Sequence, residues 1–227
     1  MARVKKIDNA IKKRIAHKQR REARAYNTRN ERKNYLIVCE GERTEPNYFT
    51  TLKRKLPKGL VEIDIEGAGA NTLSLVDIAI RIKNEQAERA KKSIIQRPYD
   101  HVWVVFDKDD FPNRNFNNAI FKARSNKIAV AYTNEAFELW YLLHFEFHNT
   151  AISRHQYYPI LTRYLGREYA KNSEDMYDLL AEIGDETQAI KWASVLLKHS
   201  DFQNPALSNP STTVHRLVQD LNKYKTG

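Results

Sequence analysis

Residues 35–45 read YLIVCEGERTE, a run of β-forming apolar residues that passes directly into three glutamates. Residues 102–110 read VWVVFDKDD and repeat this pattern with three aspartates. Such apolar runs predict buried parallel strands, so each acidic group stands at the end of a strand. Carboxylates gathered in this way raise one another's pKa and are costly to bury unless a positive charge lies among them. The two stretches therefore predict a divalent cation, and an oxygen-only set of ligands favours Mg²⁺ or Mn²⁺ over Zn²⁺.

The segments around these two strands predict an α/β fold. Residues 61–66 alternate apolar and acidic side chains, which is typical of a strand at the edge of a sheet, and residues 128–132 form the expected fourth strand. Helices are expected between the strands, with Thr44 and Thr72 as caps of the first two and residues 115–125 as the third. The succession β-α-β-α-β-α-β predicts a four-stranded parallel sheet flanked by helices.

After Glu135 the pattern becomes helical. Five segments have helical composition and are separated by Gly, Asn and Pro residues: 136–147, 155–165, 174–183, 186–199 and 211–223. We therefore expect three parts in the chain: a basic N-terminal arm over residues 1–33, an α/β domain over 34–135, and a helical C-terminal region over 136–227.

The net charge of +10 lies in the N-terminal arm. Residues 1–33 carry 13 Lys and Arg against three acids, whereas residues 34–227 carry 25 of each. Such an excess favours phosphate contacts that are independent of nucleic-acid sequence and weaken with salt, although a solvated tail has the same composition. We favour nucleic acid, DNA or RNA, as the partner. The expected contact residues are Arg14, Lys18, Arg20, Arg21, Arg24 and Arg29.

The composition excludes several classes of protein. No stretch approaches the roughly 18 to 20 apolar residues of a membrane span, and the basic N-terminus lacks the apolar segment of a signal peptide. We therefore expect a cytoplasmic protein with no membrane partner. The single cysteine, Cys39, excludes an internal disulfide and ends an apolar run, so it is expected to be buried rather than nucleophilic. The oligomeric state does not follow from the sequence.

The candidate site residues follow from the shared edge of a parallel sheet. Ligands of open parallel sheets bind outside the carboxyl ends of the strands, and side chains there converge if the first, third and fourth strands adjoin. One Mg²⁺ needs one or two carboxylates with waters and substrate phosphate, whereas five or more carboxylates suggest a pair of ions acting on the two sides of a phosphodiester. The predicted metal ligands are Glu40, Glu45, Asp107, Asp109, Asp110 and Glu135.

Two short motifs resemble the Toprim domain of topoisomerases, DnaG-type primases and OLD-family nucleases. The Glu40-Gly41 pair follows the first strand and Asp107-x-Asp109 follows a later one, and Glu45 looks like the second glutamate of the OLD-type variant. Four longer strings are similar to the RloB family, a Toprim-like group found in restriction and abortive-infection loci: CEGERTEPNYF, VWVVFDKDDF, NEAFELWYLLHF and NPSTTVHRLV. This resemblance covers most of residues 34–220.

The RloB resemblance implies a Toprim-like fold and a metal-dependent nuclease or nuclease-like effector in antiphage defence, often encoded beside an ATPase. By the same resemblance Glu40 is a general acid/base or metal ligand, and Asp107 and Asp109 are metal ligands. Glu45 would serve a second ion, and water is the expected nucleophile. Lys108 lies inside the acidic motif, where it is expected to neutralise charge when no metal is bound. Four other acids have a weaker claim to a role in the site: Glu42, Asp110, Glu135 and Glu138. A glutamate on a helix, as expected for Glu138, can simply face solvent.

Two other functions compete with this interpretation. One is a protein that binds nucleic acid without cutting it, as an adaptor subunit of an ATPase-containing defence complex, although a pure binder has no use for the acidic clusters. The other is a glycosyltransferase-like protein that holds a nucleotide-sugar through Mn²⁺ on Asp107-x-Asp109. This second alternative leaves Glu40-Gly41 and the basic arm without a role.

Overall fold

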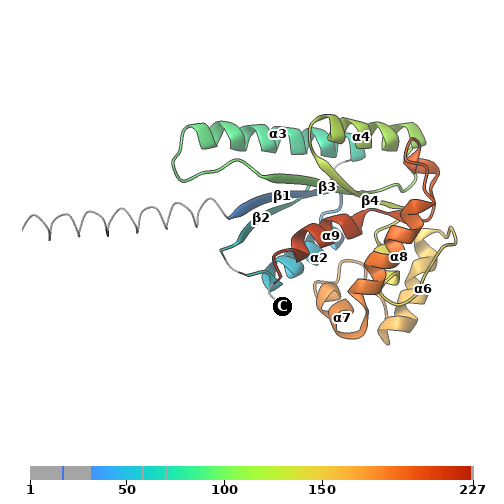
Figure 1. The fold of residues 1–227 in the computed structure, drawn as a ribbon. Helices are drawn as coiled ribbons and strands as arrows, with labels where there is room; N and C mark the ends of the chain where they lie inside the picture. The colour runs from blue at the N-terminus through green and yellow to red at the C-terminus, as the bar shows by residue number, and fades with distance from the viewer. Residues whose placement is uncertain (1–16, 18–31, 58, 70, 226–227) are drawn as a thin grey trace, which may run out of the picture. The chain divides into compact units, whose positions relative to one another are not determined.

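The computed structural model describes His17 and residues 32–57, 59–69 and 71–225 (Figure 1). The chain divides into two units, Met1–Lys33 and Asn34–Gly227. The basic residues predicted to contact phosphates lie outside the described residues: Arg14, Lys18, Arg20, Arg21, Arg24 and Arg29. Their role stays a prediction, as does a domain boundary after residue 135.

The second unit is built around one sheet of five strands in the order β2-β1-β3-β4-β5. β1 is parallel to β3 and β3 is parallel to β4, whereas β5 is antiparallel to β4. The strands are β1 Lys33–Cys39, β2 Val61–Gly67, β3 His101–Asp107, β4 Ala129–Asn134 and β5 Ser211–Thr212. The edge position of residues 61–66 is confirmed, and so is the adjacency of the first, third and fourth strands. The prediction of four strands is wrong, because β5 extends the sheet beyond β4.

β5 comes from a segment that the sequence predicts as helical. Thr212 and Ser211 pair with Thr133 and Asn134 of β4, and the Thr133 and Thr212 hydroxyls lie 3.1 Å apart. The hydroxyl of Thr213 accepts a hydrogen bond from a β4 backbone N–H at 2.8 Å. The backbone and hydroxyl groups of these residues thus bond to a strand that is distant in sequence and not within a helix. The helix expected over residues 211–223 therefore begins only after these three residues, and the C-terminal region is not entirely helical.

Helices cover both faces of the sheet. α3 and α4 lie on one face, and α2 and α9 lie on the other (Figure 1). In the described residues the α-helices are α2 Thr44–Lys55, α3 Thr72–Lys91, α4 Asn113–Ser125, α5 Glu138–Leu142, α6 Arg154–Leu165, α7 Met176–Ile183, α8 Glu186–Lys198 and α9 Val214–Asn222. None of these described helices is long and apolar enough to cross a bilayer. The helix predicted over residues 136–147 shortens to α5, because the carbonyl of His144 accepts from the backbone N–H of Asp185 at 2.9 Å.

The two threonines predicted as helix caps lie one position inside their helices. The N-cap residues are Arg43 for α2 and Asn71 for α3, and the Asn71 side chain accepts from Ser74 N at 3.1 Å. Thr44 and Thr72 are the first helical residues instead. Their hydroxyls are thus free to bond to other parts of the chain.

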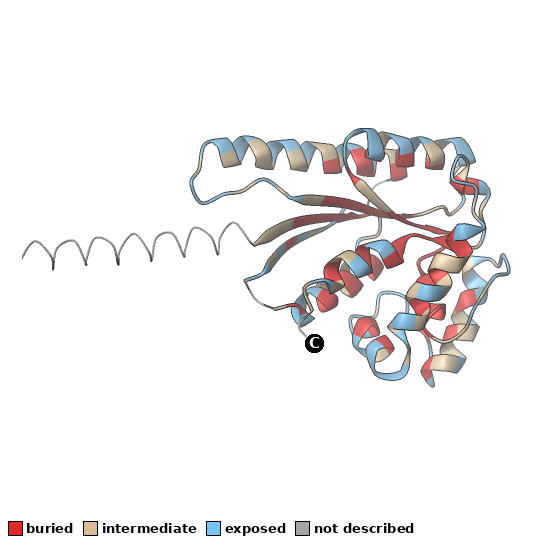
Figure 2. Cartoon of the chain, in the orientation of Figure 1, coloured by how far each residue is buried: buried red, intermediate tan, exposed pale blue. Residues whose placement is uncertain are grey.

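Alternate residues of the central strands pack against different helical layers. Leu36 and Val38 of β1 belong to a core shared with α3 and α4, whereas Ile37 and Cys39 belong to a core shared with α2 and α9. Figure 2 shows the central strands buried along their length. Burial on both faces accounts for the continuous apolar runs of β1 and β3. Because β1, β3 and β4 are parallel neighbours, their carboxyl ends lie together at one end of the sheet.

Candidate metal centre

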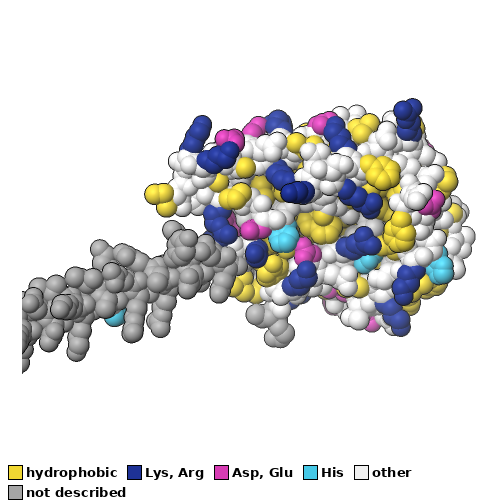
Figure 3. Space-filling model, turned by 45° about the horizontal axis from the view of Figure 1, so that its top comes forward, with side chains coloured by type: hydrophobic (Ala, Val, Ile, Leu, Met, Phe, Trp, Pro, Cys, Tyr) yellow, Lys and Arg dark blue, Asp and Glu magenta, His cyan; other side chains and the backbone are white. Residues whose placement is uncertain are grey.

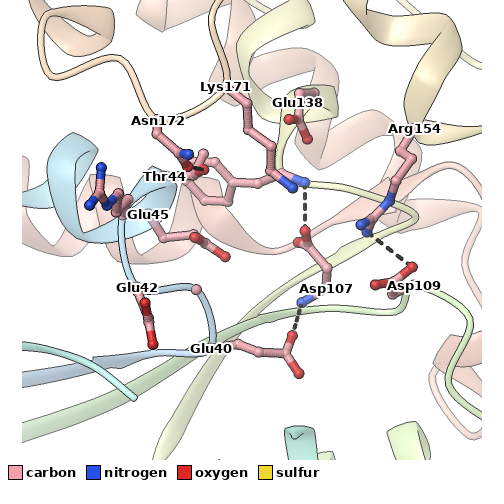
Figure 4. Close-up of a pocket in the computed structure, with 13 residues that line it drawn as sticks. Glu40, Glu42, Thr44, Glu45, Asp107, Asp109, Glu138, Arg154, Lys171 and Asn172 are labelled. Atoms are coloured by element: carbon pink, nitrogen blue, oxygen red, sulfur yellow. Dashed lines mark hydrogen bonds and ion pairs between the residues drawn. The ribbon is translucent and has the colours of Figure 1, made fainter. Parts of the chain in front are cut away.

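A pocket of about 450 Å³ opens where β1 and β3 end (Figure 4). α2, α5, the start of α6 and the loop between α6 and α7 contribute its remaining walls. Its charged lining residues are Glu40, Glu42, Glu45, Asp107, Asp109 and Glu138, with Arg43, Arg154 and Lys171. Six acids against three bases give the pocket a negative charge when all of these groups are ionised.

Glu40 is held at the exit of β1 by contacts on several sides. Its backbone N–H donates to the carbonyl of Val105 on β3 at 2.9 Å, which continues the ladder by one residue. Its carboxylate accepts from the Thr72 hydroxyl at 2.9 Å and from the Asp107 backbone N–H at 3.2 Å. Burial raises the pKa of the Glu40 carboxyl, and these two hydrogen bonds oppose the rise because they favour the charged form. The carboxylate is therefore oriented before any ligand arrives.

Gly41 allows the Glu45 carboxylate to approach the turn after β1. A Cβ atom at position 41 would overlap a carboxylate oxygen of Glu45, so any larger residue would have to displace that side chain. Glu45 itself is only 5% exposed. Burial, with repulsion from Glu138 and Glu40, raises its pKa to about 7. Glu45 is thus a carboxyl that gains or loses its proton near neutral pH.

Asp107 and Asp109 are placed by the end of β3 and the turn after it. Asp107 Oδ2 accepts from the Phe137 backbone N–H at 3.0 Å, whereas its Oδ1 is buried with no partner in the described part of the chain. Burial, with repulsion from Glu45 and Glu138, raises the pKa of Asp107. Asp109 has φ 43°, a left-handed conformation that Asp tolerates better than most residues. Its side chain faces the pocket and forms an ion pair with Arg154 at 3.1 Å (Figure 4).

The structure thus brings together four of the six predicted ligands, namely Glu40, Glu45, Asp107 and Asp109. The other two lie outside the pocket lining. Asp110 is exposed, and the Glu135 carboxylate accepts from the Arg154 backbone N–H at 3.2 Å. Lys108 also lies outside, because its ammonium donates to the backbone carbonyls of Asp109 and Phe111.

Glu138 lines the pocket, although the sequence gives only weak support for a role there. It lies on α5, is 3% exposed, and accepts from the Tyr169 hydroxyl at 2.9 Å. A signal was present, since Glu138 is the only charged residue in the apolar run over residues 136–143, and a charge inside such a run is buried with its helix. Buried charges need partners, which makes them candidates for ligand binding.

Two of the three bases in the pocket lining come from the region after β4, where the sequence shows no motif. Arg154 begins α6, and Lys171 lies in the loop between α6 and α7. This loop is fixed to α2 through Asn172. The Thr44 hydroxyl donates to Asn172 Oδ1 and the Asn47 side chain donates to the Asn172 carbonyl, both at 2.9 Å. The start of α2 and the loop after α6 therefore lie together along one side of the pocket.

The donor chemistry of the pocket fits a hard divalent cation. All candidate ligand atoms are carboxylate oxygens, and one of them, Asp107 Oδ1, has no partner among the described residues. Within the same residues, no three His, Cys, Asp or Glu side chains already converge as a closed metal cage. Mg²⁺ and Mn²⁺ do not need one, because one or two carboxylates with waters and substrate phosphate suffice. The residues therefore fit an open Mg²⁺ or Mn²⁺ site.

Comparison with known proteins gives one positive finding. The protein-family model described as RloB-like protein matches residues 35–221. No curated protein and no solved structure matches the chain. The matched region contains every charged residue that lines the pocket.

Proposed function

The chain belongs to the RloB-like family, which its match over residues 35–221 establishes, and from this premise we propose that it is a metal-dependent nuclease. Its acidic pocket would act on phosphodiester bonds of nucleic acid with Mg²⁺ or Mn²⁺. The observation that carries the proposal is the convergence of Glu40, Glu45, Asp107 and Asp109 at the carboxyl ends of neighbouring strands. The Toprim-like arrangement of the sheet and a role in antiphage defence beside an ATPase are parts of the same proposal.

Each pocket residue has a task in this reaction. Glu45, Asp107 and Asp109 would hold the ion, which when bound would polarise the phosphate and lower the pKa of an attacking water. Glu40, with its raised pKa and its fixed orientation, would take the proton of that water or give one to the leaving oxygen. Arg154 would stabilise the charge that grows on the phosphate, since a guanidinium can donate two parallel hydrogen bonds to it.

The basic arm would supply the general affinity for nucleic acid. On the face shown in Figure 3, Lys and Arg side chains are scattered among acidic and apolar ones and do not gather into one patch. The excess of bases within residues 1–33 therefore remains the main electrostatic signal for a phosphate backbone. In this proposal the arm holds the nucleic acid and the pocket cuts it.

A nuclease assay tests the proposal. Purified protein is incubated with DNA, tRNA and total RNA in Mg²⁺ or Mn²⁺, with and without the ATPase encoded beside it. Glu40→Gln and Asp107→Asn should abolish cleavage while circular dichroism shows an intact fold. Asp110→Asn should leave cleavage unchanged, since Asp110 lies outside the pocket. Cleavage at the wild-type rate by Asp107→Asn protein would refute the assignment of the metal site.

Two observations favour a second function, that of a nucleic-acid-binding adaptor for an ATPase. Asp109 is paired with Arg154, and no three His, Cys, Asp or Glu side chains of the described residues lie close enough together to hold an ion as they stand. Both features suit a pocket that no longer binds an ion. Tight binding of nucleic acid without cleavage of any substrate, with or without the ATPase, would support the adaptor.

A further inference from the structure

Lys171 reaches into the acidic pocket from a loop far from it in sequence. The loop between α6 and α7 carries Lys171 over the space bounded by Glu45, Asp107 and Glu138, and Figure 4 shows its side chain extending toward Asp107. Lys171 is an exposed residue, so its side chain lies between the solvent and these carboxylates. Lys171 is also one of the groups that oppose the rise in the pKa of Glu45.

Arg154 and Lys171, two of the three bases that line the pocket, are held in different ways. Arg154 forms an ion pair with Asp109 at 3.1 Å. The Lys171 ammonium, in contrast, makes no direct ion pair with a carboxylate of the described residues, although it lines the same pocket. Its charge is near the acids but is not fixed to any of them.

The backbone, rather than the ammonium, keeps Lys171 in place. The next residue, Asn172, has φ 80° and bonds to α2 through its side chain and its carbonyl, with Thr44 and Asn47 as donors at 2.9 Å. These contacts fix the loop and leave the four-carbon stem of Lys171 able to swing. An ammonium on a flexible stem can leave the pocket without disturbing the loop.

We propose that Lys171 is a built-in counter-ion that occupies the place of the divalent ion, and that the ion must displace it to bind. Without an ion, the Lys171 ammonium offsets the repulsion among Glu45, Asp107 and Glu138. When the ion enters, the ammonium swings out toward solvent, where it is free to contact a phosphate of the substrate. The carboxylates thus never stand without a neighbouring positive charge. This inference rests on the metal dependence of the proposed function.

A purely structural role of Lys171 predicts a different result from displacement. A lysine that only supports the loop would leave ion affinity unchanged when its charge is removed. A displaced counter-ion predicts two effects of opposite sign from one substitution. The protein without an ion becomes less stable, because the carboxylates lose their neutralising charge, and ion binding becomes tighter, because the competitor is gone.

The test measures both effects on the full chain. Mn²⁺ affinity is measured by isothermal titration calorimetry, and thermal unfolding is followed in a chelator. The variants are Lys171→Gln, Lys171→Arg, which keeps the charge, and Lys108→Gln, which removes a charge from the acidic motif but outside the pocket. We expect Lys171→Gln to bind Mn²⁺ about tenfold more tightly and to unfold at a lower temperature, whereas the other two variants stay close to wild type.

Three other outcomes would overturn the inference, and they can be distinguished from one another. Unchanged or weaker Mn²⁺ binding by Lys171→Gln, with measurable binding by the wild type, would refute the counter-ion and leave the proposed nuclease intact. Equal tightening in Lys171→Gln and Lys108→Gln would show a general charge effect without displacement. Absence of Mn²⁺ binding in every variant would refute the metal dependence, and the counter-ion with it.

Discussion

Replacing Glu45 with Gln should stabilise the protein above neutral pH in the absence of an ion. Glu45 is 5% exposed, and its pKa rises from an ordinary 4.5 to about 7, chiefly because burial disfavours the charged form. Between these two values the unfolded chain has released the proton while the folded chain still holds it. The unfolded state then binds fewer protons, so the free energy of unfolding falls as the pH rises through this window.

The size of this effect follows from the same two pKa values. A shift of one pKa unit corresponds to about 1.4 kcal/mol, so the rise in the pKa of Glu45 lowers the free energy of unfolding by about 3 kcal/mol above pH 7. Gln has nearly the same shape and carries no charge at any pH. For a chain of this size, Glu45→Gln should raise the melting temperature by about 6 to 12 °C at pH 8 and change it little at pH 4.

The assay is thermal unfolding from pH 4 to pH 8 in a chelator, followed by circular dichroism. Glu42→Gln is the matched control, since Glu42 lines the same pocket but is exposed, so the melting temperature of this variant should follow that of the wild type. A Glu45→Gln protein that is no more stable than the wild type at pH 8 would refute the argument that a buried charge destabilises the pocket.

Three further predictions test the geometry of the pocket and the arm. Gly41→Ala should destabilise the fold by about 1 to 3 kcal/mol and weaken Mn²⁺ binding, because its Cβ would displace the carboxylate beside it, and urea unfolding with calorimetry measures both. Thr72→Val removes a hydrogen-bond donor to Glu40 and should raise the pKa of this glutamate. The limb of the pH–rate profile that reports Glu40 should therefore move to higher pH, and an unchanged profile would exclude Glu40 as the titrating group. Deletion of residues 1–33 should weaken nucleic-acid binding and flatten its salt dependence, and an unaltered slope of affinity against salt would argue against the arm as the phosphate contact.

Local pattern was sufficient for the four longer strands and for part of the pocket. The apolar runs before Glu40 and Asp107 are buried on both faces of the sheet. Strands in this environment have continuous apolar sequences, so they can be recognised from the sequence. Because parallel strands end at a common edge of the sheet, the residues that follow them lie close together. This can be predicted without knowing where the helices pack. The convergence of these two acids could therefore be predicted before the structure was known.

Residues placed by a turn or by a partner segment could not be found in this way. Glu135 and Glu138 differ by three positions, and the geometry between β4 and α5 decides that the second of them lines the pocket. β5 has two residues, too few to show a period, and forms because β4 offers an unpaired edge. Thr44 and Thr72 were expected as caps, yet the true caps lie one residue earlier, a shift that local propensity does not resolve.

The sequence by itself determined the parallel α/β core, the acidic edge of the sheet and the concentration of positive charge in the first 33 residues, since each depends on neighbours along the chain. Only the tertiary structure decided which cations face the acids. Arg154 and Lys171 enter the pocket because α6 packs against α5 and the loop after α6 bonds to α2. Lys108 is nearest in sequence, but its ammonium donates to backbone carbonyls of the turn after β3. Electrostatic interactions depend on distance in space, and that distance is set by how the helical region packs on the sheet rather than by position in the chain.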